Sequence, residues 1–223
     1  MLVSWAQLRR RAPALRSDDP APIGDGTQRA AFVIRDNLRH RSDIEQVYLD
    51  AIARAQSEIL IANAYFLPGI NFRRALAVAA ARGVRVVLLL QGRVEYVMLH
   101  YASRALYGSL LDAGIEIHEY HKGFLHAKVA VIDCQWATIG SSNIDPFSLL
   151  LAREANVVID DAGFAGDLHR SLSEAMETGA SEVRRDRWAH QPFPVRAASW
   201  FFYGLARLLT GMFGYGRGTE PRW

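Results

Sequence analysis

The chain has 223 residues, half of them apolar, with a single cysteine and a formal net charge of +3. This length allows one sizeable hydrophobic core plus an appendage, and the apolar content excludes an intrinsically disordered protein. The lone Cys134 cannot form an internal disulfide, which fits a reducing compartment. A net charge this small gives no argument for nucleic-acid binding.

The first 27 residues are rich in arginine, proline, aspartate and glycine. We expect a leader or a former linker in this segment. A signal peptide is not expected, because Leu8 is followed by three arginines and no apolar core is present.

From residue 28 onward, short apolar runs alternate with amphipathic stretches, which predicts an α/β domain over residues 28–182. Ser42 and Glu45 form a capping-box pattern at the start of the first helix, and Gly83 and Gly114 end the second and third helices. Helices are expected at 43–55, 71–82, 97–113 and 164–176. Strands are expected at 31–34, 59–62, 84–90, 115–120, 129–132, 136–139 and 156–159.

Several polar and aromatic residues fall just past the carboxyl ends of predicted strands, where ligands bind in such sheets: Tyr65, Phe66, Gln91 and Arg93. Tyr65 and Phe66 line a pocket or belong to the core. Arg93 and Glu95 contact a ligand headgroup or form a surface ion pair. His121 is expected at the rim of the pocket.

The segment from 126 to 143, HAKVAVIDCQWATIGSSN, carries the main chemical pattern. His126 and Lys128 precede an apolar run of strand type, and side chains two apart in a strand share a face. Asp133 has the opposite parity, so we expect it to shape the following turn rather than to touch a substrate. Ser141 and Asn143 follow the return strand and can reach the face of His126 and Lys128.

These residue types match phosphodiester chemistry without a metal. An imidazole titrates near pH ~6.5, so it can attack as a neutral base and also carry a proton. A lysine supplies fixed positive charge to the phosphate oxygens, and serine and asparagine donate hydrogen bonds as charge builds up. A metal site built from His118, Glu119, His121 and His126 is the weaker alternative, because no helical H-x-x-x-H pair or cysteine ligand supports it.

The pattern resembles the signature of the phospholipase D superfamily, whose members use a phosphohistidine intermediate and no metal or other cofactor. A downstream glutamate in the family hydrogen-bonds the catalytic histidine, and Glu154 fits that place. A plain ion pair with Arg153 is the alternative for Glu154. The resemblance therefore implies a site composed of His126, Lys128, Asp133, Ser141, Asn143 and Glu154.

Further segments are similar to the second half of a bacterial cardiolipin synthase of the type without N-terminal membrane spans: 63–68, 91–96, 100–104 and 142–148. The resemblance implies a layered α/β/α fold with a central mixed sheet. It also implies a phosphatidyltransferase acting on phospholipids, phosphatidylglycerol among them, at the cytoplasmic side of the cell membrane. That family carries two H-x-K-x-x-x-x-D motifs and this chain carries one, so we expect half an enzyme, completed by a homodimer or by a separate first-half chain.

Two other functions stay open. A catalytically silent half would only bind membrane or a partner. A homodimeric phosphodiesterase or nuclease is a further reading, although a nuclease is expected to show a broad basic groove. Whether the chain forms a homodimer or pairs with a separate first-half chain, we expect the surface around His126, Ser141 and Phe147 to be an exposed half-site.

Residues 183–223 form a basic, aromatic tail with seven arginines against two acidic residues. Its apolar run is interrupted by Arg207 and by glycines, so a bilayer span is not expected. Aromatic residues mixed with arginines are typical of a helix lying in an anionic membrane interface. The alternative is a tail that packs on a missing half of the enzyme.

Overall fold

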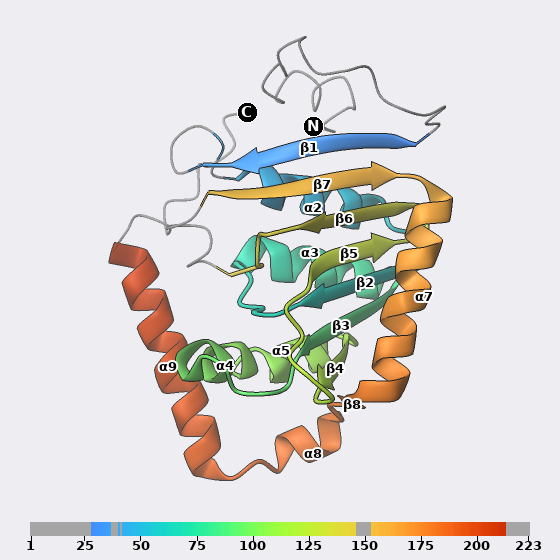
Figure 1. Ribbon diagram of the computed structural model, residues 1–223. Coiled ribbons are helices and arrows are strands. Elements are labelled where there is room, and N and C mark those ends of the chain that lie inside the picture. Colours follow the sequence, from blue (N-terminus) through green and yellow to red (C-terminus); the bar gives the residue numbers. More distant parts are fainter. Residues whose placement is uncertain (1–27, 37–39, 41, 146–152, 213–223) are drawn as a thin grey trace.

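A mixed β-sheet is the centre of the computed structural model, which describes residues 28–36, 40, 42–145 and 153–212 (Figure 1). Within these residues the sheet has eight strands in the order β1-β7-β6-β5-β2-β3-β4-β8. The strands β2, β3 and β4 are parallel, and every other neighbouring pair is antiparallel. Their bounds are β1 Arg29–Arg35, β2 Glu58–Asn63, β3 Arg85–Gln91, β4 Glu116–Tyr120, β5 Lys128–Ile132, β6 Trp136–Gly140, β7 Glu154–Asp160 and β8 Ala180–Glu182.

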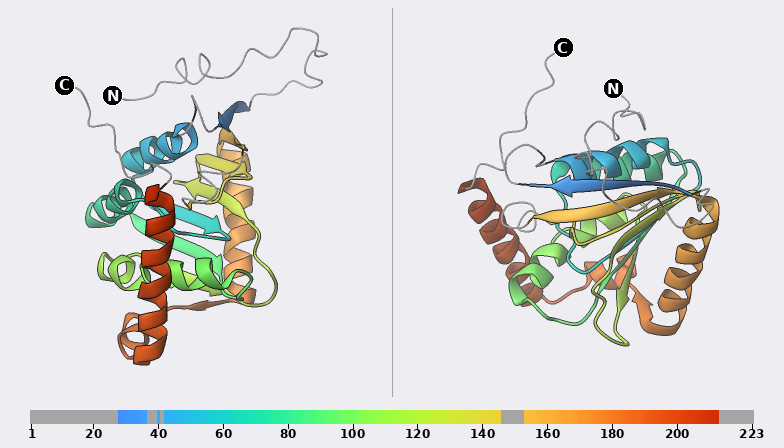
Figure 2. Two further views of the ribbon diagram at one scale, coloured as in Figure 1. Left: turned by 90° about the vertical axis from the view of Figure 1, so that its left-hand side faces the viewer. Right: turned by 45° about the horizontal axis from the view of Figure 1, so that its top comes forward.

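Helices cover both faces of the sheet, which confirms the layered α/β/α fold (Figure 2). Alternate residues of β2 pack against α2 and α3 on one face, where Ile59, Ile61 and Leu76 are fully buried. Leu60 of β2 and Leu172 of α7 belong to the core of the other face. The bounds are α2 Asp43–Arg54, α3 Ile70–Ala81, α4 Val97–Arg104, α5 Tyr107–Asp112, α7 Ala162–Gly179, α8 Arg185–Ala189 and α9 Phe193–Met212.

Three local expectations were wrong. The helix expected at 97–113 is two helices, and the turn between them keeps near-helical backbone angles at Ala105 and Leu106, so the sequence period does not reveal the break. Ser42 makes no side-chain hydrogen bond to the start of α2, so the capping box does not form. Strand β8 was missed because its three residues, Ala180, Ser181 and Glu182, have no large apolar side chain and lie at the sheet edge.

Helix α9 packs against α4 and stands beside the end of the sheet where β2 and β3 finish (Figures 1 and 2). Phe202 of α9 stacks on Tyr101 of α4 with ring centroids 5.8 Å apart, and Ala206 is fully buried. One face of the helix is therefore held by the α/β domain. Residues 1–27 and 213–223, the expected leader and the end of the tail, lie outside the described residues.

The two ends of the sheet differ in their chemistry. Strands β2, β3, β4 and β6 finish, and β5 and β7 begin, at what we call the Lys128 end, because Lys128 there pairs with Asn63 of β2. The opposite end, called the Asp133 end, carries the β5–β6 turn. Asp133 and Cys134 both have positive φ in this turn, and Gln135 N donates to Ile132 O at 3.1 Å.

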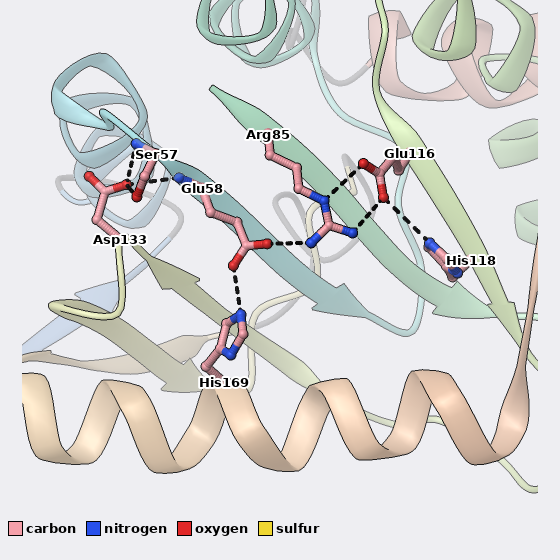
Figure 3. Close-up of polar contacts among 7 residues, drawn as sticks. All are labelled: Ser57, Glu58, Arg85, Glu116, His118, Asp133 and His169. Carbon is pink, nitrogen blue, oxygen red and sulfur yellow. Dashed lines mark hydrogen bonds and ion pairs between the residues drawn. The ribbon is translucent and has the colours of Figure 1, made fainter. Parts of the chain in front are cut away.

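Asp133 ties this turn to the start of β2 (Figure 3). Its carboxylate accepts hydrogen bonds from the amides of Gln56, Ser57 and Glu58 at 2.8–2.9 Å and from the Ser57 hydroxyl at 2.7 Å. Burial raises the pKa of the Asp133 carboxyl, but these hydrogen bonds outweigh it and leave the pKa below its usual value. The residue thus stabilises the fold, at the end of β5 opposite to Lys128.

An ion-pair network continues along the same end (Figure 3). The Arg85 guanidinium donates to Glu116 at 2.9 and 2.7 Å and to Glu58 at 2.6 Å. His169 of α7 lies 2.6 Å from the Glu58 carboxylate. The hydrogen bonds from Arg85 lower the pKa of the Glu116 carboxyl. The network joins β2, β3, β4 and α7.

We predict that Asp133→Ala lowers the free energy of unfolding by about 2 kcal/mol or more, because several hydrogen bonds to a carboxylate are lost. Because the folded pKa is depressed, this contribution is present at neutral pH and is lost as the pH falls through the folded pKa, below the ordinary value of 3.8. Urea unfolding at pH 7 measures it. The control Asp167→Ala, on the exposed face of α7, should stay within about 0.5 kcal/mol of the parent. Equal effects of both substitutions would contradict the assignment.

Candidate active site

Lys128 is a buried cation at its end of the sheet. It is the first residue of β5, its side chain is 7% exposed, and its ammonium donates to the His126 carbonyl at 3.0 Å. Burial lowers the pKa of Lys128, while the negative charges of Glu154, Glu95 and Asp145 raise it. The negative charges that act on this ammonium group thus come from the loop after β3, the loop after β6 and the start of β7.

His126 is exposed and directly precedes this lysine's strand. The neighbouring Ala127 carbonyl accepts from Ala64 N at 2.9 Å, which continues the β2–β5 pairing one residue beyond the strand. Its imidazole makes no hydrogen bond with any residue that the structure describes. The backbone is thus fixed while the ring stays accessible.

Ser141 and Glu154 come together across the ends of β6 and β7. Ser141 N donates to Ala155 O at 3.0 Å, Ala155 N donates to Ser141 Oγ at 3.1 Å, and the Ser141 hydroxyl donates to the Glu154 carboxylate. The sequence expectation placed Glu154 on the imidazole of His126, or alternatively on Arg153. Within the described chain its hydrogen-bond partner is Ser141.

Gly140 has no room for a side chain at the same end of the sheet. A Cβ placed there would lie 2.1 Å from Asn156 Oδ1 and 2.5 Å from the Ala155 carbonyl. Asn156 is buried and donates to Thr138 Oγ1 at 3.1 Å, so its amide cannot move aside without losing that bond. The glycine of the motif lets β7 approach closely and places the backbone of Ser141.

The segment after β6 is anchored by buried polar residues that sequence analysis did not assign to the site. Asn63, fully buried, accepts from Ile144 N at 3.3 Å, and Leu67 N donates to Ile144 O at 2.7 Å. Arg35, also fully buried at the end of β1, donates to Ser142 Oγ at 3.1 Å. The sequence signal that could have identified Asn63 and Arg35 is that each is a polar residue at the end of an apolar strand.

Asn143 lies half-buried in this anchored segment, between Ser142 and Ile144. Phe147 lies outside the described residues. The structure therefore brings Lys128, Ser141 and Glu154 to one end of the sheet with His126 next to them in the chain. It keeps Asp133 away from them, as expected, because Asp133 lies in the turn at the opposite end of β5.

The loops that follow β2, β3 and β4 contain several of the predicted pocket residues, and we call these loops the rim of the site. Tyr65 donates to Glu95, and burial together with this bond raises the pKa of the Tyr65 hydroxyl. Arg93 donates to the His121 carbonyl at 2.8 Å instead of pairing with Glu95. Phe66 is 1% exposed and belongs to the core. The rim is thus a charged and aromatic border whose acidic residue, Glu95, acts on Lys128.

Two further histidines lie near this rim. Burial, with the positive charge of Arg104 and the nearby His121, lowers the pKa of His100 to about 4. His100 is therefore neutral at physiological pH and a poor proton donor. His121 lies 3.8 Å from the Glu119 carboxylate. Over the residues with described positions, no group of three histidine, cysteine, aspartate or glutamate side chains is arranged to hold a metal ion.

We predict that Gly140→Ala destabilises the protein by about 1–3 kcal/mol through overpacking against Asn156 and Ala155. Gly166→Ala is the matched control, because no heavy atom lies within 4 Å of the added methyl group in α7. That substitution should be neutral or stabilising by up to about 1 kcal/mol. Thermal unfolding of both variants measures the difference. A Gly140→Ala protein as stable as the parent would refute the close packing.

Comparison with protein families gives a match to the family model described as "Cardiolipin synthase, PLD-like domain" over residues 48–176. The chain is 44% identical over 158 residues to cardiolipin synthase B of Escherichia coli K12 and of Shigella flexneri, covering 71% of this chain and 38% of each relative. It is 32% identical to cardiolipin synthase A of Erwinia tasmaniensis over 90% of this chain and 41% of that protein. The chain thus spans about two fifths of the length of these relatives.

Solved structures show the same fold. The phospholipase D family member Nuc of Salmonella typhimurium aligns with a TM-score of 0.58 at 20% identity, over 70% of this chain and 99% of Nuc. Phosphatidylserine synthase of Haemophilus influenzae aligns with a TM-score of 0.65 at 13% identity, over 81% of this chain and 47% of that enzyme. Because the family model covers more than half of the sequence and the fold agrees, the chain belongs to the cardiolipin synthase family of phospholipase D-like domains.

Proposed function

We propose that this domain transfers phosphatidyl groups between phospholipids, in the manner of a cardiolipin synthase, with phosphatidylglycerol as a substrate. The observation that carries the proposal is a buried lysine, Lys128, whose ammonium donates to the backbone carbonyl of the exposed His126 at one end of the sheet. A lysine held in this way is suited to bind a phosphate anion beside the attacking group. The similarity to cardiolipin synthases supports a lipid substrate.

The reaction proceeds in two displacements at phosphorus. A ring nitrogen of one imidazole attacks the phosphodiester, so that an N–P bond forms while the P–O bond to the leaving alcohol breaks. A second imidazole gives its proton to the departing oxygen. The hydroxyl of the acceptor lipid then attacks the same phosphorus, returns a proton to the second imidazole, and the N–P bond breaks. His126 is one of these two imidazoles.

The surrounding side chains divide the remaining tasks. Lys128 and the donors Ser141 and Asn143 stabilise the phosphate oxygens as charge builds up on them. Glu154 accepts the hydrogen bond of the Ser141 hydroxyl and its negative charge acts on Lys128, so it holds both phosphate-binding groups in place. Asp133 contributes stability from the opposite end of the sheet. Tyr65 and Glu95 border the bound headgroup.

The exposed apolar face of helix α9 supports a position at the membrane surface, and we propose the cytoplasmic side, as the family resemblance implies. Its outer face exposes Phe193, Phe201 and Leu208, which are 80%, 66% and 62% exposed. Aromatic and apolar side chains on one face of a helix are typical of interfacial binding. Among the described helices, none is long and apolar enough to cross a bilayer. We assign this face to peripheral contact with lipid.

The second imidazole must come from another phospholipase D-like domain. The chain holds one H-x-K-x-x-x-x-D motif, and the low pKa of His100 makes it unsuitable as the proton donor. A twofold homodimer would place two copies of His126 face to face, since such an interface joins the same patch of each subunit. A separate first-half chain would serve equally.

We predict that His126→Ala abolishes transfer, a loss of at least about a hundredfold, because the attacking or proton-donating group is removed. The assay follows the conversion of phosphatidylglycerol in vesicles to cardiolipin by mass spectrometry. His190→Ala, an exposed histidine near α9, is the control and should keep the parent rate. Turnover by the His126 variant close to the parent rate would sink the mechanism. A folded parent that converts no phospholipid would favour the silent-half reading.

We also predict that activity depends on association. Light scattering and lipid turnover are measured on the same dilution series, and specific activity should fall as the assembly dissociates to monomer. If the partner is a first-half chain, activity should appear only when that chain is added. Full turnover by a demonstrated monomer would contradict the two-imidazole scheme.

A further inference from the structure

A cavity of about 570 Å³ lies away from the Lys128 site, between α3, α4, α5, α8 and α9. Four arginines from four helices line it, Arg73, Arg104, Arg185 and Arg196, with Asp112 as the acidic residue of the lining. Its volume is within the range of small-ligand pockets. We call it the arginine cavity.

Two of the four arginines are already engaged. Arg104 donates to Glu119 at 2.5 Å and lies over the Trp188 ring, 5.0 Å from its centroid. Arg185 pairs with Asp112 at 2.8 Å. Each of these two guanidinium groups therefore already has an acidic partner.

The other two arginines carry uncompensated charge. Neither Arg73 nor Arg196 has an acidic partner within the described ranges, and Arg73 Nε is a buried donor without a hydrogen-bond acceptor there. A buried donor left unsatisfied costs free energy, which an anionic ligand would recover. The guanidinium fork matches the oxygens of a phosphate group. The cavity is therefore complementary to a phosphate anion.

The aromatic lining indicates what the phosphate is attached to. Trp200 and Tyr203 of α9 line the cavity, and Trp200 is also 58% exposed. The same helix exposes Phe201 and Leu208. Aromatic rings beside basic groups, continuing into exposed apolar residues, fit a molecule with an anionic headgroup and acyl chains.

We propose that the arginine cavity binds the phosphate headgroup of an anionic phospholipid, with the acyl chains lying along α9. Since α9 stands beside the Lys128 end of the sheet, a lipid held there would keep that end at the membrane surface (Figures 1 and 2). This site goes beyond the transfer reaction and does not require turnover.

The test uses the full chain carrying Lys128→Met, so that the Lys128 site no longer holds phosphate. Calorimetry measures the binding of dihexanoyl phosphatidylglycerol below its micelle concentration. Adding Arg73→Gln and Arg196→Gln should weaken binding by at least about tenfold, because two charge-assisted contacts are lost. The matched control adds Arg74→Gln and Arg170→Gln, which remove the same charge outside the cavity, and should stay within about twofold.

Three results would overturn the proposal: equal weakening in the control, no weakening in the cavity variant, or equally tight binding of dihexanoyl phosphatidylcholine. Inorganic phosphate that binds as tightly as the lipid would assign the cavity to free phosphate instead. If the double variant does not fold, as judged by circular dichroism, the exposed Arg196→Gln alone should weaken lipid binding at least about threefold. Because no turnover is measured, failure of the transfer reaction would leave this result unchanged.

Discussion

Burying a lysine ammonium at the end of a β-sheet is the constraint around which this domain is organised. Removing a charge from water is expensive unless hydrogen bonds and opposite charges compensate it. The buried charge of Lys128 is compensated by the hydrogen bond to the His126 carbonyl and by the negative charges of Glu154, Glu95 and Asp145. These groups come from β7, from the loop after β3 and from the loop after β6. The compensation of the Lys128 charge therefore depends on β3, β6 and β7 ending or beginning at the same end of the sheet as β5.

The two ends of β5 differ, with a network of stabilising contacts at one end and the proposed site at the other. At one end, Asp133 and the Arg85 network fasten the turn, the start of β2 and the neighbouring strands. At the other end, buried amides such as Asn63 and Asn156 hold the loop after β6 and the start of β7. Ser141 and Glu154 are placed there by hydrogen bonds and stay at least partly exposed, which the proposed binding of a phosphate requires.

Helix α9 links this site to a surface. Its inner face packs on α4 through Phe202, while its outer face keeps apolar side chains exposed and its flank closes the arginine cavity. Truncation of the helix would therefore disturb the domain as well as any lipid contact, since Ala206 lies in the core. Substitutions confined to one face of the helix separate these effects more cleanly than deletion does.

The sequence by itself determined the alternation of strands and helices and the place of Asp133 in the turn after β5, because apolar runs and turn positions are local properties. It did not determine the break at Ala105, where the backbone stays near-helical, or strand β8, whose three residues have no apolar pattern. Only the tertiary structure decided the partner of Glu154, the anchoring roles of Asn63 and Arg35, and the arginine cavity. Each of these depends on contacts between segments far apart in the chain, whose meeting is fixed by strand order and helix packing.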